Sequence, residues 1–478
     1  MLFNSLDFAI FLPIVFILYW FVANKNLKLQ NFLIVAASYL FYGWWDWRFL
    51  SLILFSTLVD FMVGKKLRSE ENQLKRKVLL WTSVLVNLGF LGFFKYYNFF
   101  LDNFITAFSF FGQDIQANSL NIILPVGISF YTFQTLSYTI DVYKRKLEPT
   151  KDFIAFSSFV SFFPQLVAGP IERATNLLPQ FYTKRHFDYS KAVDGIYLII
   201  WGLFKKIVIA DSCAIYTNEI FSKYETMNSL SLLMGAIYFA FQIYGDFSGY
   251  SDIAIGISKL FGIHLKRNFA FPYFSRDIAE FWRRWHISLS TWFRDYLYIP
   301  LGGSKVSKLL SFRNIFIIFL VSGFWHGANW TFIIWGILNT LYFIPLFLTN
   351  RNRNNLDIVS KGKIFPSFYE LISMTTTFFL VIMGWIFFRA DSVSIAIHYI
   401  KKLFSFNFEY GLQYLSIERY TPELMILILC FVIVEWNSRE NEHPFFGKWL
   451  NFKLILTLIG LIALGVYSNV NDFIYFQF

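Results

Sequence analysis

The chain has 478 residues, of which 56% are hydrophobic, 22% are aromatic and only 15% are charged. Soluble domains carry roughly a quarter charged residues, so this composition excludes a soluble globular enzyme and a disordered chain. Lipid can surround helices whose apolar side chains water would not tolerate. We therefore expect an all-α polytopic membrane protein that forms a single integral membrane domain over residues 1–478.

The charge balance is basic, with 42 Lys and Arg against 31 Asp and Glu and a formal net charge of +11. A nucleic-acid partner could explain such an excess, but the basic residues fall between apolar segments, where they orient membrane helices by the positive-inside rule. We expect no nucleic-acid partner. The dense positive charge of residues 65–77 and 144–151 places both loops in the cytoplasm, and the resulting alternation places both chain ends outside.

Apolar segments long enough to cross a bilayer recur along the whole chain. A hydrocarbon core of about 30 Å needs about 20 apolar residues per helix. We predict ten or eleven spans, because some of the following segments are short or interrupted. They begin near Phe8, Gln30, Phe49, Val78, Ile122, Ala192, Ser231, Phe312, Trp330, Phe368, Glu423 and Leu454. The segment 153–168 is short and rich in Ser and Pro, so we expect it to re-enter the membrane without crossing it.

His326 is the best single candidate for a catalytic residue. It lies in SGFWHGANW, in the middle of 37 residues between Arg313 and Arg351 that contain no Asp, Glu, Lys or Arg. An ionisable side chain at membrane depth is costly and indicates function by default. Small neighbours such as Gly323 would let another helix approach closely, and Asn329 adds one amide. The structural alternative is a histidine that only hydrogen-bonds a neighbouring helix.

A second unusual stretch, residues 276–300, mixes aromatic and basic residues too evenly for a span. At about 100° per residue, the aromatic side chains fall on one face, and the opposite face carries Arg283, His286, Ser290 and Arg294. This pattern predicts one interfacial helix at the cytoplasmic surface. It serves either as a membrane anchor or, through Arg283, Arg284 and Arg294, as a binding site for an anionic ligand, with His286 facing the interior.

The third stretch, residues 242–268, contains two carboxylates and two hydroxyls in an otherwise apolar segment, which we expect Gly245 and Gly249 to interrupt. The polar members are Asp246, Ser248, Tyr250 and Asp252. They either line an internal path or act as structural glue, with an Asp paired to an arginine of the following stretch. Glu172 can be explained as a solvated side chain, and we expect the histidines at 186, 264, 398 and 443 at the surface.

Several common catalytic motifs are missing from the sequence. There is no GxxxxGK[ST] loop, HExxH, CxxC or GxSxG, so a P-loop, zinc hydrolysis and a serine lipase triad lose support. Cys213 and Cys430 lie far apart in apolar surroundings, and we predict neither a disulfide nor a metal site. Acyl transfer and transport are the remaining classes.

Five motifs together resemble a known family. They are PVGISFYTFQTLSYTIDVY (125–143), FFPQLVAGPIER (162–173), YGDFSGYSDIAIG (244–256), FWRRWHISLSTWFRDYLYIPLGG (281–303) and SGFWHGANW (322–330). In this order they resemble the membrane-bound O-acyltransferase family, in particular its bacterial branch that acetylates alginate, cellulose or peptidoglycan, with teichoic acid D-alanyl transfer as a related activity. The resemblance implies a bacterial inner-membrane protein whose helical bundle surrounds a funnel.

The resemblance also implies site residues and partners. The family's catalytic histidine corresponds to His326, and its second polar position corresponds to His286. Acetyl-CoA would be the acyl-donor substrate and no bound cofactor is implied. The acceptor would be a polysaccharide outside the cell, reached directly or through an extracytoplasmic SGNH-type acetyltransferase or accessory protein. Membrane lipid would surround the chain.

The chain ends in DFIYFQF, which is predicted to lie outside. The resemblance includes a similar tyrosine motif at the end of a small partner protein of the D-alanyl transfer system. Tyr475 is therefore either a hydroxyl that relays the acyl group or an aromatic anchor that closes the last span. Beyond acyl transfer, two other functions stay open at this point, a transporter or flippase of polysaccharide or lipid and a scaffold that recruits secreted enzymes.

Overall fold

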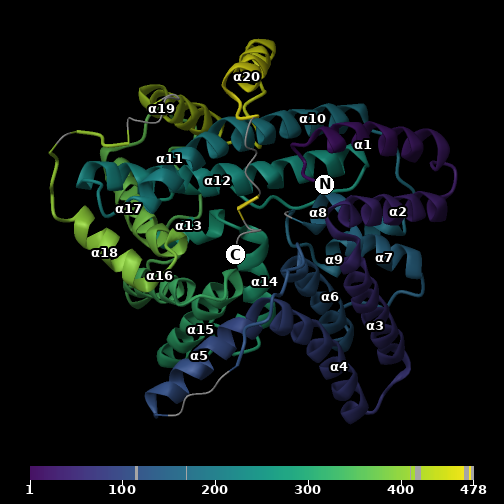
Figure 1. Ribbon diagram of the computed structural model, residues 1–478. Coiled ribbons are helices and arrows are strands. Elements are labelled where there is room, and N and C mark those ends of the chain that lie inside the picture. Colours follow the sequence, from purple (N-terminus) through teal and green to yellow (C-terminus); the bar gives the residue numbers. More distant parts are fainter. Residues whose placement is uncertain (113–116, 168, 410, 415–420, 468–472, 475–478) are drawn as a thin grey trace. The chain divides into compact units, whose positions relative to one another are not determined.

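The computed structural model describes residues 1–478 except 113–116, 168, 410, 415–420, 468–472 and 475–478. All regular elements in these described ranges are helices (Figure 1). Six helical segments are long and apolar enough to cross a membrane, namely Leu27–Ser69, Gln73–Phe110, Ser229–Leu260, Lys308–His326, Trp330–Leu348 and Phe368–Arg389. Three shorter apolar helices are Leu6–Val22, Leu424–Ser438 and Leu450–Leu464. The chain is thus an all-α multi-pass membrane protein, as predicted.

The predicted spans agree with these segments at most positions. Leu27–Ser69 contains two of them, because a 3₁₀ turn at Trp47–Phe49 separates helix α2 (Leu27–Asp46) from helix α3 (Leu50–Ser69). The stretches that begin near Ile122 and Ala192 form helices but are not among the candidate spans. The first of these, α6 (Ile128–Tyr143), has 16 residues, nearly all of them buried by protein. Burial in the protein interior explains its apolar pattern as well as lipid would.

The chain divides into two compact contact units. Unit 1 comprises Met1–Ile196 and Ala254–Lys266, and unit 2 comprises Tyr197–Ile253 and Arg267–Phe478. Helices α10 (Tyr189–Leu203) and α12 (Ser229–Leu260) contribute residues to both. The prediction of a single membrane domain over 1–478 and the prediction of a funnel stay predictions.

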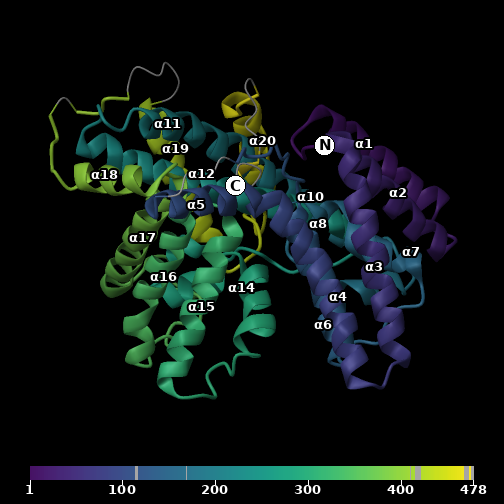
Figure 2. The same ribbon diagram turned by 60° about the horizontal axis from the view of Figure 1, so that its bottom comes forward.

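Unit 1 is built from the helices of the first part of the chain. Besides α2, α3 and α6 these are α1 (Leu6–Ile17), α4 (Gln73–Leu91), α5 (Tyr97–Phe110), α7 (Phe153–Ser161), α8 (Phe163–Leu166) and α9 (Ala174–Leu177). Helices α3, α4 and α6 pack side by side (Figure 2). The segment predicted to re-enter the membrane forms the two short helices α7 and α8, whose residues from Ala155 to Leu166 are buried. Its re-entry into the membrane stays a prediction.

Unit 2 contains the remaining helices. They are α11 (Asp211–Ser222), α13 (Ile278–Arg284), α14 (Ile287–Phe293), α15 (Lys308–His326), α16 (Trp330–Leu348), α17 (Phe368–Arg389), α18 (Val393–Leu403), α19 (Thr421–Ser438) and α20 (Leu450–Leu464). A π-helix, η5 (Phe204–Ala210), joins α10 to α11. Helices α15 and α16 form an antiparallel pair that packs on α17 (Figure 1).

The predicted interruption at Gly245 and Gly249 is wrong, because α12 runs without a break from Ser229 to Leu260. A Cβ on Gly245 would lie 2.8 Å from the carbonyl oxygen of Lys205, and one on Gly249 would lie 2.7 Å from that of Gly202. Both glycines therefore allow the backbone of α12 to approach α10 and η5 closely. This close packing brings the polar side chains of α12 next to those of η5.

Candidate functional site

His326 is the last residue of α15, at the corner where the chain turns into α16, and not in the middle of a span. Its side chain is buried, with 4% exposure. The imidazole meets the ring of Trp335 edge-on at 5.1 Å between centroids and lies 5.2 Å from the ring of Phe388. The predicted position of this histidine in an apolar interior is therefore confirmed.

The local sequence explains the corner. Gly327 is extended, and Asn329 caps α16 by accepting a hydrogen bond from the Thr331 N–H at 3.0 Å. The Asn329 amide also donates to the carbonyl oxygen of Asp391 at 2.9 Å, so this residue has a structural role in the described structure. A Cβ on Gly323 would lie 2.3 Å from the carbonyl oxygen of Phe332. The glycine thus permits the close helix pairing predicted around His326.

His286 is also buried, but the single interfacial helix predicted around it is wrong. Helix α13 ends at Arg284 and α14 begins at Ile287, because His286 has a left-handed backbone with φ of 43°. The 100° periodicity therefore does not continue through residues 276–300. The turn directs the imidazole inward, with 1% exposure, and its Nδ1 lies 3.2 Å from Oδ1 of Asn268.

The two predicted histidines share a neighbour. The ring centroid of Trp325 lies 5.9 Å from that of His286 and 4.9 Å from that of His326. His286 also packs edge-on against Phe247 of α12 at 4.6 Å. Unit 2 thus brings together, around one indole, the two histidines that lie 40 positions apart in the sequence. The arrangement supplies two imidazoles in a water-poor aromatic environment, which suits general base catalysis.

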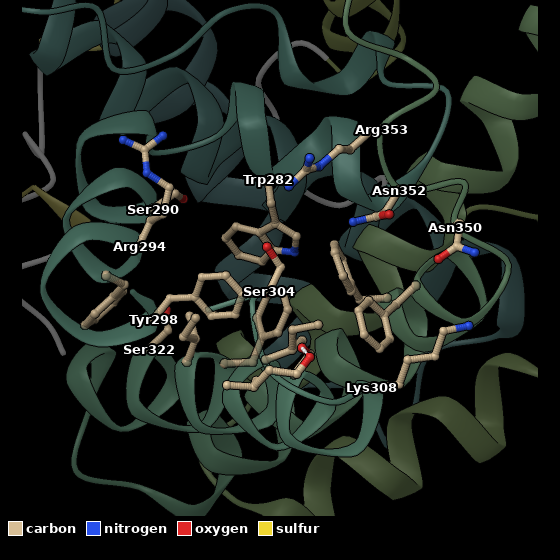
Figure 3. Close-up of a pocket in the computed structure, with 18 of the residues that line it drawn as sticks. Trp282, Ser290, Arg294, Tyr298, Ser304, Lys308, Ser322, Asn350, Asn352 and Arg353 are labelled. Carbon is tan, nitrogen blue, oxygen red and sulfur yellow. Dashed lines mark hydrogen bonds between the residues drawn. The ribbon is translucent and has the colours of Figure 1, made fainter. Parts of the chain in front are cut away.

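A cavity of about 590 Å³ opens in unit 2 beside the helix that ends in His326 (Figure 3). Its lining is mainly apolar and includes Trp282, Phe319 and Phe343, and its polar lining residues include Ser322. Ser322 lies four residues before His326 on α15, which corresponds to a rise of about 6 Å along the helix.

The cations of the cavity are Arg294, Lys308 and Arg353. Figure 3 shows Arg353, Asn352 and Asn350 on one side of the cavity and Arg294 on the other. Arg294 was predicted as a ligand-binding residue, whereas Lys308 and Arg353 were missed. Both missed residues lie in loop-like or helix-terminal sequence, where a basic side chain is unremarkable.

Arg283 and Arg284 do not line this cavity. The guanidinium of Arg283 donates to the carbonyl oxygens of Asn352 and Asn355 at 2.9 and 2.8 Å. Arg284 pairs with Glu280 at 2.8 Å and donates to the carbonyl oxygen of Asp357 at 2.7 Å. Both arginines therefore hold the loop between α16 and α17, and that loop carries Asn350, Asn352 and Arg353 into the cavity wall.

The carboxylates of α12 pair with lysines and not with the arginines that were predicted. Lys205 Nζ lies 2.6 Å from Asp252, and Lys206 Nζ lies 2.8 Å from Asp211 and 2.9 Å from Asp246. All five side chains are buried. Each buried carboxylate needs a cation beside it, because a buried charge without an opposite charge would strongly destabilise the fold. The two adjacent lysines within the apolar run IIWGLFKKIVIA were an available signal that the sequence analysis did not use.

Two polar residues of α12, Tyr250 and Asp246, contact the last described part of the chain. Tyr250 is buried, and its ring lies 4.5 Å from that of Phe473, while Ser248 is fully buried. The Ile474 N–H donates to Asp246 at 2.6 Å. Tyr475 lies outside the described residues. The segment that leads to it thus packs in unit 2 against α12.

The remaining predictions had mixed outcomes. Glu172 is buried and accepts hydrogen bonds from Asn176 and from the Lys266 N–H, so its expected solvation is wrong. His443 is also buried, against the prediction, and its Nδ1 accepts a hydrogen bond from the Phe445 N–H. The histidines at 186, 264 and 398 are exposed as predicted. Cys213 and Cys430 are free thiols. Across the described ranges, no group of three or more His, Cys, Asp or Glu side chains could hold a metal ion.

Comparisons with known proteins cover the part of the chain that contains both histidines and the cavity. A model of the membrane-bound O-acyltransferase family matches residues 144–383, which include both histidines and the cavity. "Probable alginate O-acetylase AlgI" of Pseudomonas syringae is 38% identical, with alignment over 85% of this chain and 76% of that protein. "Probable alginate O-acetylase AlgI" of Pseudomonas aeruginosa is 37% identical over 85% and 75%. "Peptidoglycan O-acetyltransferase" of Helicobacter pylori is 32% identical over 100% and 98%.

Proposed function

Because the chain belongs to the membrane-bound O-acyltransferase family and is an O-acyltransferase, we propose that it transfers an acetyl group from acetyl-CoA to a polysaccharide hydroxyl. The donor comes from the cytoplasm and the acceptor lies outside the cytoplasmic membrane of a bacterium. Alginate and peptidoglycan are the acceptor classes that the relatives' names suggest, and cellulose remains a third. Family membership favours this enzyme over the transporter and the scaffold.

The observation that supports the proposal best is the cavity beside α15. Acetyl-CoA combines phosphates with an apolar arm that ends in a thioester. Arg294, Lys308 and Arg353 supply positive charge for phosphates, and the apolar lining around Phe319 and Phe343 suits the arm. In this proposal the thioester lies beside Ser322, which is about one helical turn from His326. In this proposal Arg283 and Arg284 act on the donor indirectly, through the loop that they hold.

The chemistry needs one proton acceptor and no redox step. The acceptor oxygen attacks the thioester carbonyl carbon, the new C–O bond forms, and the C–S bond breaks. His326 takes the proton of the attacking hydroxyl as a general base and returns it to the departing thiolate of CoA. The aromatic wall formed by Trp325, Trp335 and Phe388 excludes water that would otherwise hydrolyse the thioester.

Transfer to the polysaccharide is either direct or through Tyr475 and an extracytoplasmic partner of the SGNH type. A series of contacts between aromatic rings supports the relay. Phe473 contacts Phe247 at 5.8 Å, and Phe247 contacts His286 at 4.6 Å. The residues just before Tyr475 therefore lie two ring contacts from a candidate catalytic histidine. Tyr475→Phe removes the hydroxyl that a relay requires, and unchanged acetylation in this variant would exclude the relay.

The decisive test uses the full-length protein in lipid nanodiscs with acetyl-CoA labelled on the acetyl group and a soluble alginate or peptidoglycan fragment as the hydroxyl acceptor. We expect the wild type to release CoA thiol and His326→Ala to release none above background, at equal protein level and equal melting temperature. A wild-type protein that binds but never consumes acetyl-CoA would overturn the proposed donor. In cells, loss of acetyl groups from the surface polysaccharide on gene deletion identifies the acceptor.

A further inference from the structure

His286 has one bonded ring nitrogen and one that is open. Its Nδ1 lies 3.2 Å from Oδ1 of Asn268, whereas its Nε2 has no hydrogen-bond partner among the described residues. The ring is 1% exposed, so bulk water does not satisfy Nε2. A buried polar atom without a partner in a native structure needs an explanation, and a bound ligand is one of the few available.

The surroundings of Asn268 fix the orientation of its amide. The Ser288 N–H and the Ser288 hydroxyl both donate to Asn268 Oδ1, at 3.2 and 2.9 Å. A backbone N–H can only donate, so the amide atom that faces it must be the oxygen. That oxygen also faces His286 Nδ1, and the two atoms form a hydrogen bond only when Nδ1 carries the proton of the neutral ring; the Ser288 hydroxyl, already donated to Asn268, lies farther from Nδ1, at 3.5 Å. The lone pair of the imidazole then lies on Nε2.

Asn268 also holds the backbone that presents the ring. Its carbonyl oxygen accepts a hydrogen bond from the Ile287 N–H at 2.9 Å. His286 itself has φ of 43°, a left-handed conformation that a residue with a Cβ adopts only when its surroundings enforce it. One asparagine thus fixes the position of the histidine through its main chain and the tautomer through its side chain.

The other contacts of the ring are apolar. Phe247 of α12, Phe269 and Trp325 of α15 pack against it, and in the described part of the chain no charged side chain is recorded in contact with it. Burial among these rings lowers the pKa of His286 to about 3, so the neutral form is the one present near pH 7. The amide nitrogen of Asn268 has no recorded partner in the described residues either.

We propose that Asn268 is a positioning residue that holds His286 as its Nδ1–H tautomer, so that Nε2 accepts a hydrogen bond from the hydroxyl of the acyl acceptor. The proposal rests on the proposed function and extends it to the acceptor side. His286 then orients the nucleophile, while His326 takes its proton. A histidine that bound the acyl donor at the cytoplasmic surface would be exposed to solvent. His286 is buried, so its proposed role is a different one.

The first experiment does not depend on activity. Full-length protein with ¹⁵N-labelled histidine is reconstituted in lipid, and the imidazole ¹⁵N signals are assigned by comparison with His286→Gln. We expect a protonated Nδ1 and a bare Nε2 for His286 at pH 7. The opposite tautomer would overturn the proposal, whatever the enzyme does with acetyl-CoA.

The second experiment uses Asn268→Asp, which keeps an oxygen facing Ser288 and His286 and adds a negative charge. The carboxylate stabilises the imidazolium and raises the pKa of His286, so the accepting form is lost at a higher pH than in the wild type. We expect the pH at which the His286 ¹⁵N signals report protonation of the ring to move upward by about one pH unit or more. Asn31→Asp is the matched control, because it places the same charge beside Arg185 in unit 1 and makes no recorded contact with His286.

The two experiments distinguish failure of the inference from failure of the proposed function. If the wild type consumes acetyl-CoA and Asn268→Asp leaves the pH of His286 protonation unchanged, the positioning role is wrong although the enzyme assignment stands. If the wild type consumes no acetyl-CoA, the proposed function fails, and the tautomer measurement still decides whether Asn268 holds His286 as described.

Discussion

Two buried polar clusters in this protein differ in whether their hydrogen bonds are complete. In unit 1, Asp60 of α3 accepts hydrogen bonds from Ser83, from Asn87 at 2.9 Å and from Thr139 at 2.9 Å. The Asn87 oxygen in turn accepts from Ser56 and Thr135. No polar side-chain atom of this Asp60 cluster is recorded without a partner in the described residues.

The His286 cluster of unit 2 is equally buried but incomplete. Its Asn268 oxygen is bonded, whereas His286 Nε2 and Asn268 Nδ2 have no recorded partner in the described ranges. A complete network stabilises helix packing and leaves nothing for a ligand to bind. An incomplete one is destabilising unless a substrate completes it. The comparison therefore predicts a structural role for the Asp60 cluster and a ligand-binding role for the His286 cluster, although burial and composition are similar.

The largest expected effect is the loss of His326. His326→Ala should lower turnover of acetyl-CoA by about 10²- to 10⁴-fold, since a general base contributes that much, with the melting temperature unchanged. Thiol release from labelled acetyl-CoA by protein in nanodiscs is the measurement. The control is His186→Ala, which removes an exposed histidine and should leave turnover unchanged. Equal turnover in both variants would mean that His326 is only packed between helices.

Loss of Lys206 should be the largest stability effect. Lys206→Met leaves Asp211 and Asp246 buried without their cation, which should reduce the free energy of unfolding by about 3–5 kcal/mol. Denaturant titration in detergent measures it. Lys206→Met combined with Asp246→Asn should recover part of the loss, because one unpaired charge is removed. No recovery, together with a change in turnover per folded molecule, would point to a catalytic role for Asp246.

Substitution of Asp60 should lower stability without changing turnover, which is the opposite of the effect expected for His326→Ala. Asp60→Ala leaves the donors of Ser83, Asn87 and Thr139 without their acceptor, and should reduce the free energy of unfolding by about 3 kcal/mol. Turnover per folded molecule should stay at the wild-type value, as measured by thiol release corrected for the folded fraction. If Asp60→Ala instead lost turnover and kept its stability, a complete hydrogen-bond network would no longer indicate a structural role.

Much of this arrangement was predictable from the sequence, for identifiable physical reasons. The helical class follows from composition, and His326 was predictable because an uncharged run of 37 residues isolates it. His286 was predicted correctly to face inward, but on a wrong helix. Periodicity assumes right-handed backbone throughout, and the left-handed φ at His286 depends on contacts with Asn268, which lies 18 residues earlier.

The partners of buried groups were the least predictable feature. The pairing of Asp246 and Asp252 with Lys206 and Lys205 requires knowing that Gly245 and Gly249 bring α12 against η5. A glycine that permits close packing and one that breaks a helix look alike in a sequence. Likewise, Arg283 and Arg284 are as basic as Arg353, and only the fold shows that they bind loop carbonyls.

The smallest expected effects lie at the cations of the cavity, where water weakens each charge. Arg353→Gln should raise the KM for acetyl-CoA about fivefold with kcat unchanged, because one exposed ion pair contributes about 1 kcal/mol. Lys308→Gln should act similarly, and both effects should shrink at high salt. Lys305→Gln, an exposed lysine outside the cavity lining, is the control. If Arg353→Gln instead lowers kcat, the loop that Arg283 and Arg284 hold positions the thioester as well as the phosphates. Charge at the cavity mouth would then act on the chemical step itself.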